Sequence, residues 1–240
     1  MSYKLLKSPS QWEIIIKDID SNTEFSLMDR YKEKCPICYY PTTLMKEVEC
    51  HEGLLNYNEK FSFIAGHYYE TDYKNRPNNW FGELLNKISQ QPFKHSHELL
   101  HLILKSKILN SGWNLNYIQV ATMVPTNNQQ MQRLFAEVSE SLRINWIAFN
   151  ELFEKKDLTM YYKYRLDYVN KKYSLNDDAI NLLLSIKNLQ HILIFDDVLH
   201  QGWTFGRIIE LLNPLNLSKI YLATVGRTVP KTFKKTFSFP

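Results

Sequence analysis

Glycine and cysteine are both scarce in this chain of 240 residues, which contains 7 glycines and 3 cysteines. The glycines form neither G-x-G-x-x-G nor G-x-x-x-x-G-K-[ST], so the sequence lacks the two commonest nucleotide-binding loops. An odd number of cysteines, with no signal peptide ahead of them, argues against a secreted disulfide framework. No apolar run approaches the roughly 20 residues that a membrane-spanning helix needs. We therefore expect a soluble, cytoplasmic protein.

An excess of charge of one sign is also nearly absent. The 29 Lys and Arg residues against 25 Asp and Glu leave a net charge of +4, which is too small to indicate a nucleic-acid-binding protein by itself. Hydrophobic residues at 44% and charged residues at 22% are typical of a globular protein and exclude a disordered or collagen-like chain. The length is sufficient for one domain with a small appendage.

Hydrophobic patterning predicts an alternation of strands and helices. Strands are expected at 12–16, 61–69, 117–124, 145–149, 191–195 and 219–225. Helices are expected at 81–90, 94–109, 129–142, 177–187 and 204–212, and the Lys- and Tyr-rich stretch 150–173 fits neither pattern. This order predicts an α/β fold with a central, mainly parallel sheet flanked by helices.

The most informative segment follows the apolar strand Ile192–Phe195. Asp196 and Asp197 stand where that strand is expected to end, and open α/β sheets bind ligands at this edge. Adjacent carboxylates can accept hydrogen bonds from ribose hydroxyls or help to hold Mg²⁺. Gly202 and Thr204 then lie at the start of a helix, where backbone N–H groups favour a phosphate. The segment therefore indicates a sugar-phosphate site; the alternative is a surface turn whose acids only cap the helix.

The order of four apolar residues, two acids, two apolar residues and x-x-Gly-x-Thr resembles the phosphoribosyl-pyrophosphate (PRPP) loop of type I phosphoribosyltransferases. The chain as a whole is similar to the competence-associated ComF family, in which a cysteine knuckle precedes such a domain. The similarity extends over about 35–228 and rests on the following further segments: Cys35-Pro36-Ile37-Cys38, 61–87, Val124-Pro125, 165–170 and 223–228. It implies an N-terminal extension with a knuckle at 1–60 and a phosphoribosyltransferase-like domain at 61–240.

The resemblance implies that PRPP, or a related nucleotide or ribose phosphate, binds with Mg²⁺. Asp196 and Asp197 would contact the ribose hydroxyls. The 5′-phosphate would be held by Val198, Leu199, Gln201, Gly202, Trp203 and Thr204. The resemblance further implies transfer of the phosphoribosyl group to a nitrogen base. It also suggests a role in DNA uptake, with single-stranded DNA and a competence helicase-type protein as partners.

Two departures from the family pattern bear on catalysis. His200-Gln201 stands where the family has Thr-Thr, and His200 is a candidate general base or, alternatively, a solvent-facing loop residue. The family's Arg-Gly-Phe-Asn element is absent after Val-Pro, which leaves Thr126 and Arg133, or the lysines at 155–156, as candidates for the pyrophosphate side. A catalytically degenerate member that binds single-stranded DNA or a partner protein is therefore an alternative hypothesis.

The cysteines suggest a metal site. The C-x-x-C spacing of Cys35 and Cys38 lets both thiolates reach one tetrahedral Zn²⁺, and Cys50 would be a third ligand. His51 is the nearest fourth ligand, and His67 is another. The alternative is ordinary buried thiols.

A second metal motif lies further along the chain. His97, Glu98 and His101 match H-E-x-x-H, the pattern of a zinc metalloprotease whose glutamate is the general base. Glu137 or Glu140 would be the third ligand, and a polar helix face is the simpler alternative. Separately, tyrosines interleave with lysines at 155–172 and aromatic residues with lysines at 231–235, which could stack the bases of single-stranded DNA.

Overall fold

The computed structural model describes residues 3–7, 14–20, 22, 24–26, 63–69, 94–156, 165–199 and 201–229. All statements below on the structure concern these residues. In this part of the chain, no helix combines the length and apolar character that crossing a membrane requires.

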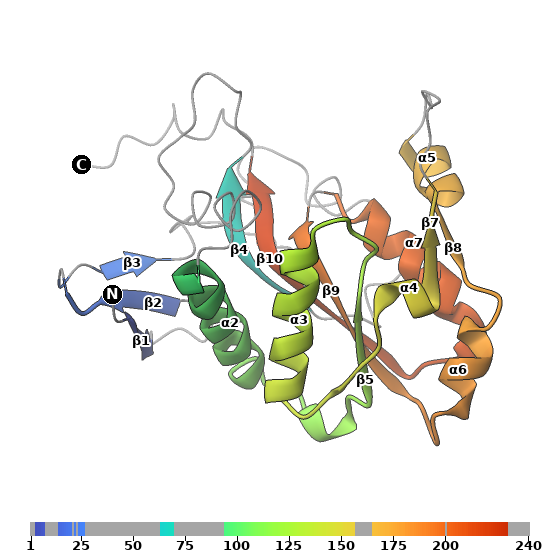
Figure 1. The fold of residues 1–240 in the computed structure, drawn as a ribbon, viewed down its shortest axis with the longest axis horizontal. Helices are drawn as coiled ribbons and strands as arrows, with labels where there is room; N and C mark the ends of the chain where they lie inside the picture. The colour runs from blue at the N-terminus through green and yellow to red at the C-terminus, as the bar shows by residue number, and fades with distance from the viewer. Residues whose placement is uncertain are drawn as a thin grey trace.

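A five-stranded sheet forms the centre of the fold, and every strand pair in it is parallel. Its strands, in spatial order, are β4 (Phe63–Tyr69), β10 (Lys219–Val229), β9 (His191–Leu199), β5 (Val120–Met123) and the two-residue β6 (Asn145–Trp146). The arrowheads of β4, β9 and β10 lie at the same edge of the sheet (Figure 1). Parallel strands must be joined by crossover connections, which here contain helices.

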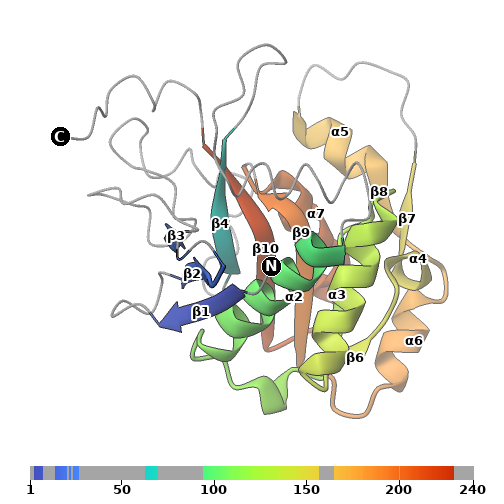
Figure 2. The same ribbon diagram turned by 60° about the vertical axis from the view of Figure 1, so that its left-hand side comes forward.

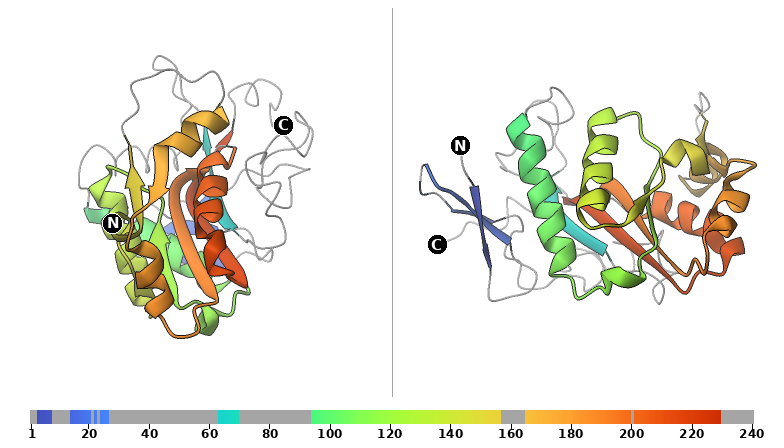
Figure 3. Two further views of the ribbon diagram at one scale, coloured as in Figure 1. Left: turned by 90° about the vertical axis from the view of Figure 1, so that its right-hand side faces the viewer. Right: turned by 60° about the horizontal axis from the view of Figure 1, so that its bottom comes forward.

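Helices cover both faces of this sheet. On one face, α2 (Lys94–Leu109) and α3 (Gln129–Ser141) pack over the alternate strand residues Leu193, Phe195 and Tyr221. On the other face, α7 (Trp203–Leu212) packs with shorter elements over Ile192 and Ile194. In the left view of Figure 3, α3 and α7 lie on opposite sides of the sheet. The expected α/β architecture, a parallel sheet with flanking helices, is confirmed.

Shorter helices and strands cover the same face of the sheet as α7. They are α4 (Phe149–Leu152), β7 (Phe153–Lys155), α5 (Arg165–Lys172), β8 (Tyr173–Leu175), α6 (Ala179–Ser185) and the 3-10 helix η4 (Asn213–Leu215). β7 and β8 pair as an antiparallel ribbon, and α5 packs against α7. Figure 2 shows α5 near the edge of the sheet where the strand arrowheads lie.

Near the N-terminus, three strands form a separate antiparallel sheet. They are β1 (Tyr3–Lys7), β2 (Ile14–Asp18) and β3 (Glu24–Ser26). The cysteine knuckle expected within 1–60 lies outside the described residues. The helix expected at 81–90 lies outside them as well.

Three of the expected strands need correction, and the unassigned stretch 150–173 has defined elements. The strand expected at 117–124 is limited to Val120–Met123, because the preceding Leu115–Tyr117 forms the 3-10 helix η3. The strand expected at 145–149 ends at Trp146, and the stretch at 150–173 contains two helices and two strands around a gap in the description. The strand expected at 191–195 continues to Leu199, which places the acid pair inside the strand.

Candidate functional site at the carboxyl edge of the sheet

Asp196 and Asp197 occupy the last part of β9, the middle strand of the sheet. Asp196 lies opposite Thr224 of β10 in the strand register. The Asp197 backbone N–H donates to Asp196 Oδ1 at 2.9 Å, and the Val198 N–H donates to Asp197 Oδ1 at 2.7 Å. Each carboxylate is therefore turned back onto the amide of the following residue.

The alternation of side chains along β9 is interrupted at this point. Leu199 belongs to the same core cluster as Ile192 and Ile194, although it follows them by an odd number of positions, seven and five. A regular strand would place Leu199 on the opposite face, because its side chains alternate with a period of two. The backbone therefore departs from regular β geometry between Ile194 and Leu199, where the two carboxylates lie.

Burial raises the pKa of Asp196 well above its ordinary value, and the neighbouring Asp197 charge raises it further. The hydrogen bond from the Asp197 amide acts in the opposite direction but does not outweigh burial. A carboxyl group in this state binds a proton or a cation more readily than an exposed aspartate does, because either one removes the cost of a buried negative charge. A carboxyl group with a raised pKa is therefore suited to accept hydrogen bonds from hydroxyl groups or to contact a metal-bound ligand.

Tyr173 of β8, in the segment that the sequence pattern left unassigned, lies close enough to Asp196 for its pKa to respond to that charge. Burial raises the pKa of Tyr173; Lys172 lowers it, and Asp196 raises it by its charge. The Lys172 ammonium lies 4.8 Å from the centre of the Tyr168 ring and 5.5 Å from that of Tyr173. Lys172 therefore pairs with the two tyrosine rings, which come from α5 and β8.

Gly202 begins α7 with a φ of 83°. This left-handed conformation favours glycine, because other residues adopt it at a cost. No described side chain hydrogen-bonds the first turn as a cap, and that turn contains no acidic residue. Trp203 and Thr204 follow in the first turn and are half-buried. A helix therefore begins directly after Gly202, where the sequence predicts the start of one.

The loop between β5 and α3 lies at the same edge of the sheet. Val124 N–H donates to Phe195 O at 2.8 Å, which holds the start of this loop against β9. Lys155 Nζ of β7 donates to Asn127 Oδ1 at 3.2 Å. Thr126 lies in this loop, whereas the Arg133 side chain, one turn into α3, is directed to Glu137.

Several candidates from the sequence cannot be placed. His200, the proposed general base, lies outside the described residues, as does the whole proposed zinc set of Cys35, Cys38, Cys50 and His51. The residues that the structure does bring to one edge are Asp196, Asp197, Gly202, Trp203, Thr204 and Thr126.

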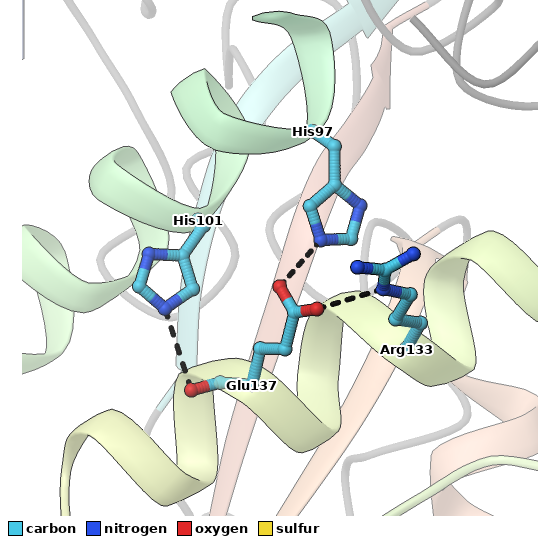
Figure 4. Close-up of polar contacts among 4 residues, drawn as sticks. All are labelled: His97, His101, Arg133 and Glu137. Carbon is cyan, nitrogen blue, oxygen red and sulfur yellow. Dashed lines mark hydrogen bonds and ion pairs between the residues drawn. The ribbon is translucent and has the colours of Figure 1, made fainter. Parts of the chain in front are cut away.

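The H-E-x-x-H motif lies in α2, on the face of the sheet away from α7. His97 Nε2 is 2.7 Å from Glu137 Oε2, and His101 Nε2 is 3.3 Å from the Glu137 backbone oxygen (Figure 4). The same carboxylate accepts a hydrogen bond from Arg133 Nε at 2.7 Å. Among the described residues, no group of three or more His, Cys, Asp and Glu side chains is arranged to hold a metal ion.

Tyr173 and Thr224 are neighbours of Asp196 that no motif in the sequence indicates. Aligning the two apolar runs 192–195 and 220–223 as adjacent parallel strands would have paired Thr224 with Asp196. Tyr173 carries no such signal, because its position depends on how β7, α5 and β8 fold over the sheet.

Comparison with known proteins assigns no family: no family model matches the chain, and no curated protein matches it. Fold and site define an α/β protein with an acidic pair at the carboxyl edge of a parallel sheet, followed by a helix start that no described side chain caps.

Proposed function

We propose that this chain is a phosphoribosyltransferase-like protein of the ComF type, which binds PRPP or a related ribose phosphate with Mg²⁺ at 196–204. The observation that carries the proposal is the sequence of elements at the end of β9: two adjacent carboxylates, then Gly202 and a start of α7 that no described side chain caps. This arrangement lies where parallel α/β sheets bind their ligands.

Each part of the proposed site matches one part of such a ligand. The carboxylates of Asp196 and Asp197 suit vicinal ribose hydroxyls and the Mg²⁺ that accompanies a phosphate. The N–H groups in the first turn of α7 suit the 5′-phosphate, because the helix dipole adds to their hydrogen bonds. Glycine at position 202 allows the backbone to turn toward the phosphate.

Phosphoribosyl transfer makes a further demand on the site. The bond from the anomeric carbon to the pyrophosphate oxygen would break, the new bond to a nitrogen base would form, and the positive charge would develop on the ribose ring. The protein would contribute mainly position and electrostatic stabilisation, including a place for the departing pyrophosphate.

Calorimetric titration of PRPP with Mg²⁺ into the wild type and into the double variant Asp196→Asn/Asp197→Asn tests the proposal. The wild type is expected to release binding heat that the variant lacks. Asp177→Asn/Asp178→Asn is the matched control, because these adjacent aspartates are exposed at the start of α6. Equal heats from the wild type and the 196/197 variant would overturn the proposal.

A further inference from the structure

The amino edge of the parallel sheet, opposite the arrowheads in Figure 1, includes four connections that the structure describes in full. They are 110–119 before β5, 142–144 before β6, 186–190 before β9 and 213–218 before β10. Together with the first residues of β9 and β10, these connections contain the basic residues Arg143, Lys187 and Lys219 and no aspartate or glutamate. Arg143 and Lys187 are exposed. The acid pair of the described residues thus lies at one edge of the sheet, and these cations lie at the other.

An aromatic cluster lies at the same edge. The ring centres of Tyr117 and His191 are 5.6 Å apart, and those of His191 and Tyr221 are 5.9 Å apart. The Trp113 ring lies 4.9 Å from that of Tyr221, and Lys219 Nζ lies 4.8 Å from the centre of the Tyr221 ring. Tyr221 is buried, whereas Tyr117 is 58% exposed. The cluster therefore has a buried base and presents one aromatic side chain to the solvent.

Gln119 fixes the connection before β5 to the connection before β9. Its Oε1 accepts hydrogen bonds from the N–H groups of Gln190 at 2.8 Å and His191 at 3.1 Å. Its Nε2 donates to the backbone oxygen of Asn188, the residue after Lys187. A surface held in this way loses less conformational entropy on binding than a flexible one.

The residue types at this edge are those of a protein interface. Tyrosine, tryptophan and arginine most often carry the binding energy of such interfaces. The basic residues call for acidic groups on the partner, because complementary charge favours association.

A nucleic acid fits this edge less well. The helices α2, α3, α6 and α7 all end here, and the partial negative charge at each helix C-terminus offsets part of the positive charge. Binding to a phosphate backbone depends on many cations that neutralise phosphates.

We infer that the amino edge around Tyr117 is a docking surface for another protein, which presents an acidic segment with an aromatic or aliphatic side chain. Carboxylates of that segment pair with Arg143, Lys187 and Lys219, and its apolar side chain packs on Tyr117. The surface lies at the edge opposite to 196–204, so it is independent of the proposed ligand site.

Fluorescence anisotropy of a labelled random copolymer of glutamate and tyrosine, titrated with the full chain, tests this docking surface. The wild type is expected to bind the copolymer, with an affinity that falls at least about threefold between about 50 mM and about 300 mM salt. Tyr117→Ser and Lys187→Glu should each weaken binding at least about fivefold. Lys156→Glu is the matched control at an exposed lysine outside this surface, and it should stay within about twofold of the wild type.

Equal affinities of the wild type, Tyr117→Ser and Lys187→Glu, or no binding of the copolymer, would overturn the inference. Tighter binding of a labelled single-stranded oligonucleotide than of the copolymer would assign the surface to nucleic acid instead. A wild-type dimer that Tyr117→Ser abolishes in sedimentation would assign it to a second copy of the chain. Because Tyr117 is exposed, Tyr117→Ser should melt with the wild type, and its titration with PRPP should be unchanged, which separates this surface from the proposed function.

Discussion

His97 of α2 and Glu137 of α3 meet between the two helices, with 2.7 Å between Nε2 and Oε2, although they are 40 residues apart in the chain. Arg133 donates to the other oxygen of the same carboxylate. The H-E-x-x-H motif therefore contributes to a contact between helices in this structure. Arg133, whose side chain is 71% exposed, is thereby paired with Glu137 one turn further along α3.

The pKa of Glu137 is lowered from its ordinary value of 4.5, chiefly by the hydrogen bond from Arg133; burial opposes this, and His97 adds to it. A carboxylate with a lowered pKa stabilises the fold above its unfolded pKa, and this stabilisation is lost as the pH falls through the folded pKa. Because the Glu137 side chain is 37% exposed, Glu137→Gln is expected to cost less than about 1 kcal/mol at pH 7.

Urea unfolding at pH 7 and at pH 3 measures this difference. The cost of Glu137→Gln should be present at pH 7 and should shrink below pH 4.5. Glu140→Gln is the matched control, since Glu140 lies exposed on the same helix. A cost that is the same at both pH values would contradict the ionic contribution.

Asp196→Asn is expected to make the protein more stable while removing ligand binding. The pKa of Asp196 is raised above 3.8 by burial and by Asp197, so stability falls as the pH rises above 3.8 and the buried group is forced to ionise. The neutral asparagine avoids this cost and should raise the free energy of unfolding at pH 7. Chemical unfolding from pH 3 to 8 should show the gain fading toward pH 3, with Asp177→Asn as control. If Asp196→Asn were less stable than the wild type at pH 7, the claim that the Asp196 charge destabilises the fold would be wrong.

Thr122 in β5 is fully buried, and its Oγ1 has no hydrogen-bond partner among the described residues. Thr122→Val keeps the shape of the side chain and removes the unpaired hydroxyl, so it should raise the free energy of unfolding by about 1 kcal/mol. Ser139→Ala is the contrasting variant, because its buried hydroxyl donates to Phe135 O at 2.8 Å, and it should destabilise slightly. Denaturant unfolding of both distinguishes the two cases; a Thr122→Val variant less stable than the wild type would show that the hydroxyl is bonded.

Phe135 of α3 stacks on Phe195 of β9 with ring centres 4.7 Å apart, and both side chains are fully buried. Phe135→Ala should cost about 3–5 kcal/mol, because it leaves a cavity between helix and sheet. Leu184→Ala, at a side chain that is 64% exposed, should change stability by less than about 0.5 kcal/mol. Thermal unfolding measures both, and similar costs for the two would contradict this packing.

The cysteine segment stays a prediction. Purified protein should contain about one equivalent of zinc, and Cys38→Ser should lose it. Elemental analysis decides the matter: less than about a tenth of an equivalent in the wild type would exclude the site.

The main elements of the fold could be predicted because their apolar side chains recur at the spacing of a helix or a strand. Residues 94–109 carry apolar side chains at helical spacing, and the structure has α2 at Lys94–Leu109. By contrast, the end of β9 was placed four residues early, because Asp196 and Asp197 are unusual in a buried strand. Pairing with β10 extends the strand through them, and hydrogen bonding between strands is not visible in one segment alone.

The sequence by itself determined the α/β class, the acid pair and the glycine before α7, because each depends on residues that are near one another in the chain. Only the tertiary structure decided that Tyr173 lies within electrostatic range of Asp196, that Arg133 turns to Glu137, and that Asn128 caps the start of α3. These relationships depend on which helix packs on which face of the sheet and on which amides are already bonded. Both are set by the packing of distant segments.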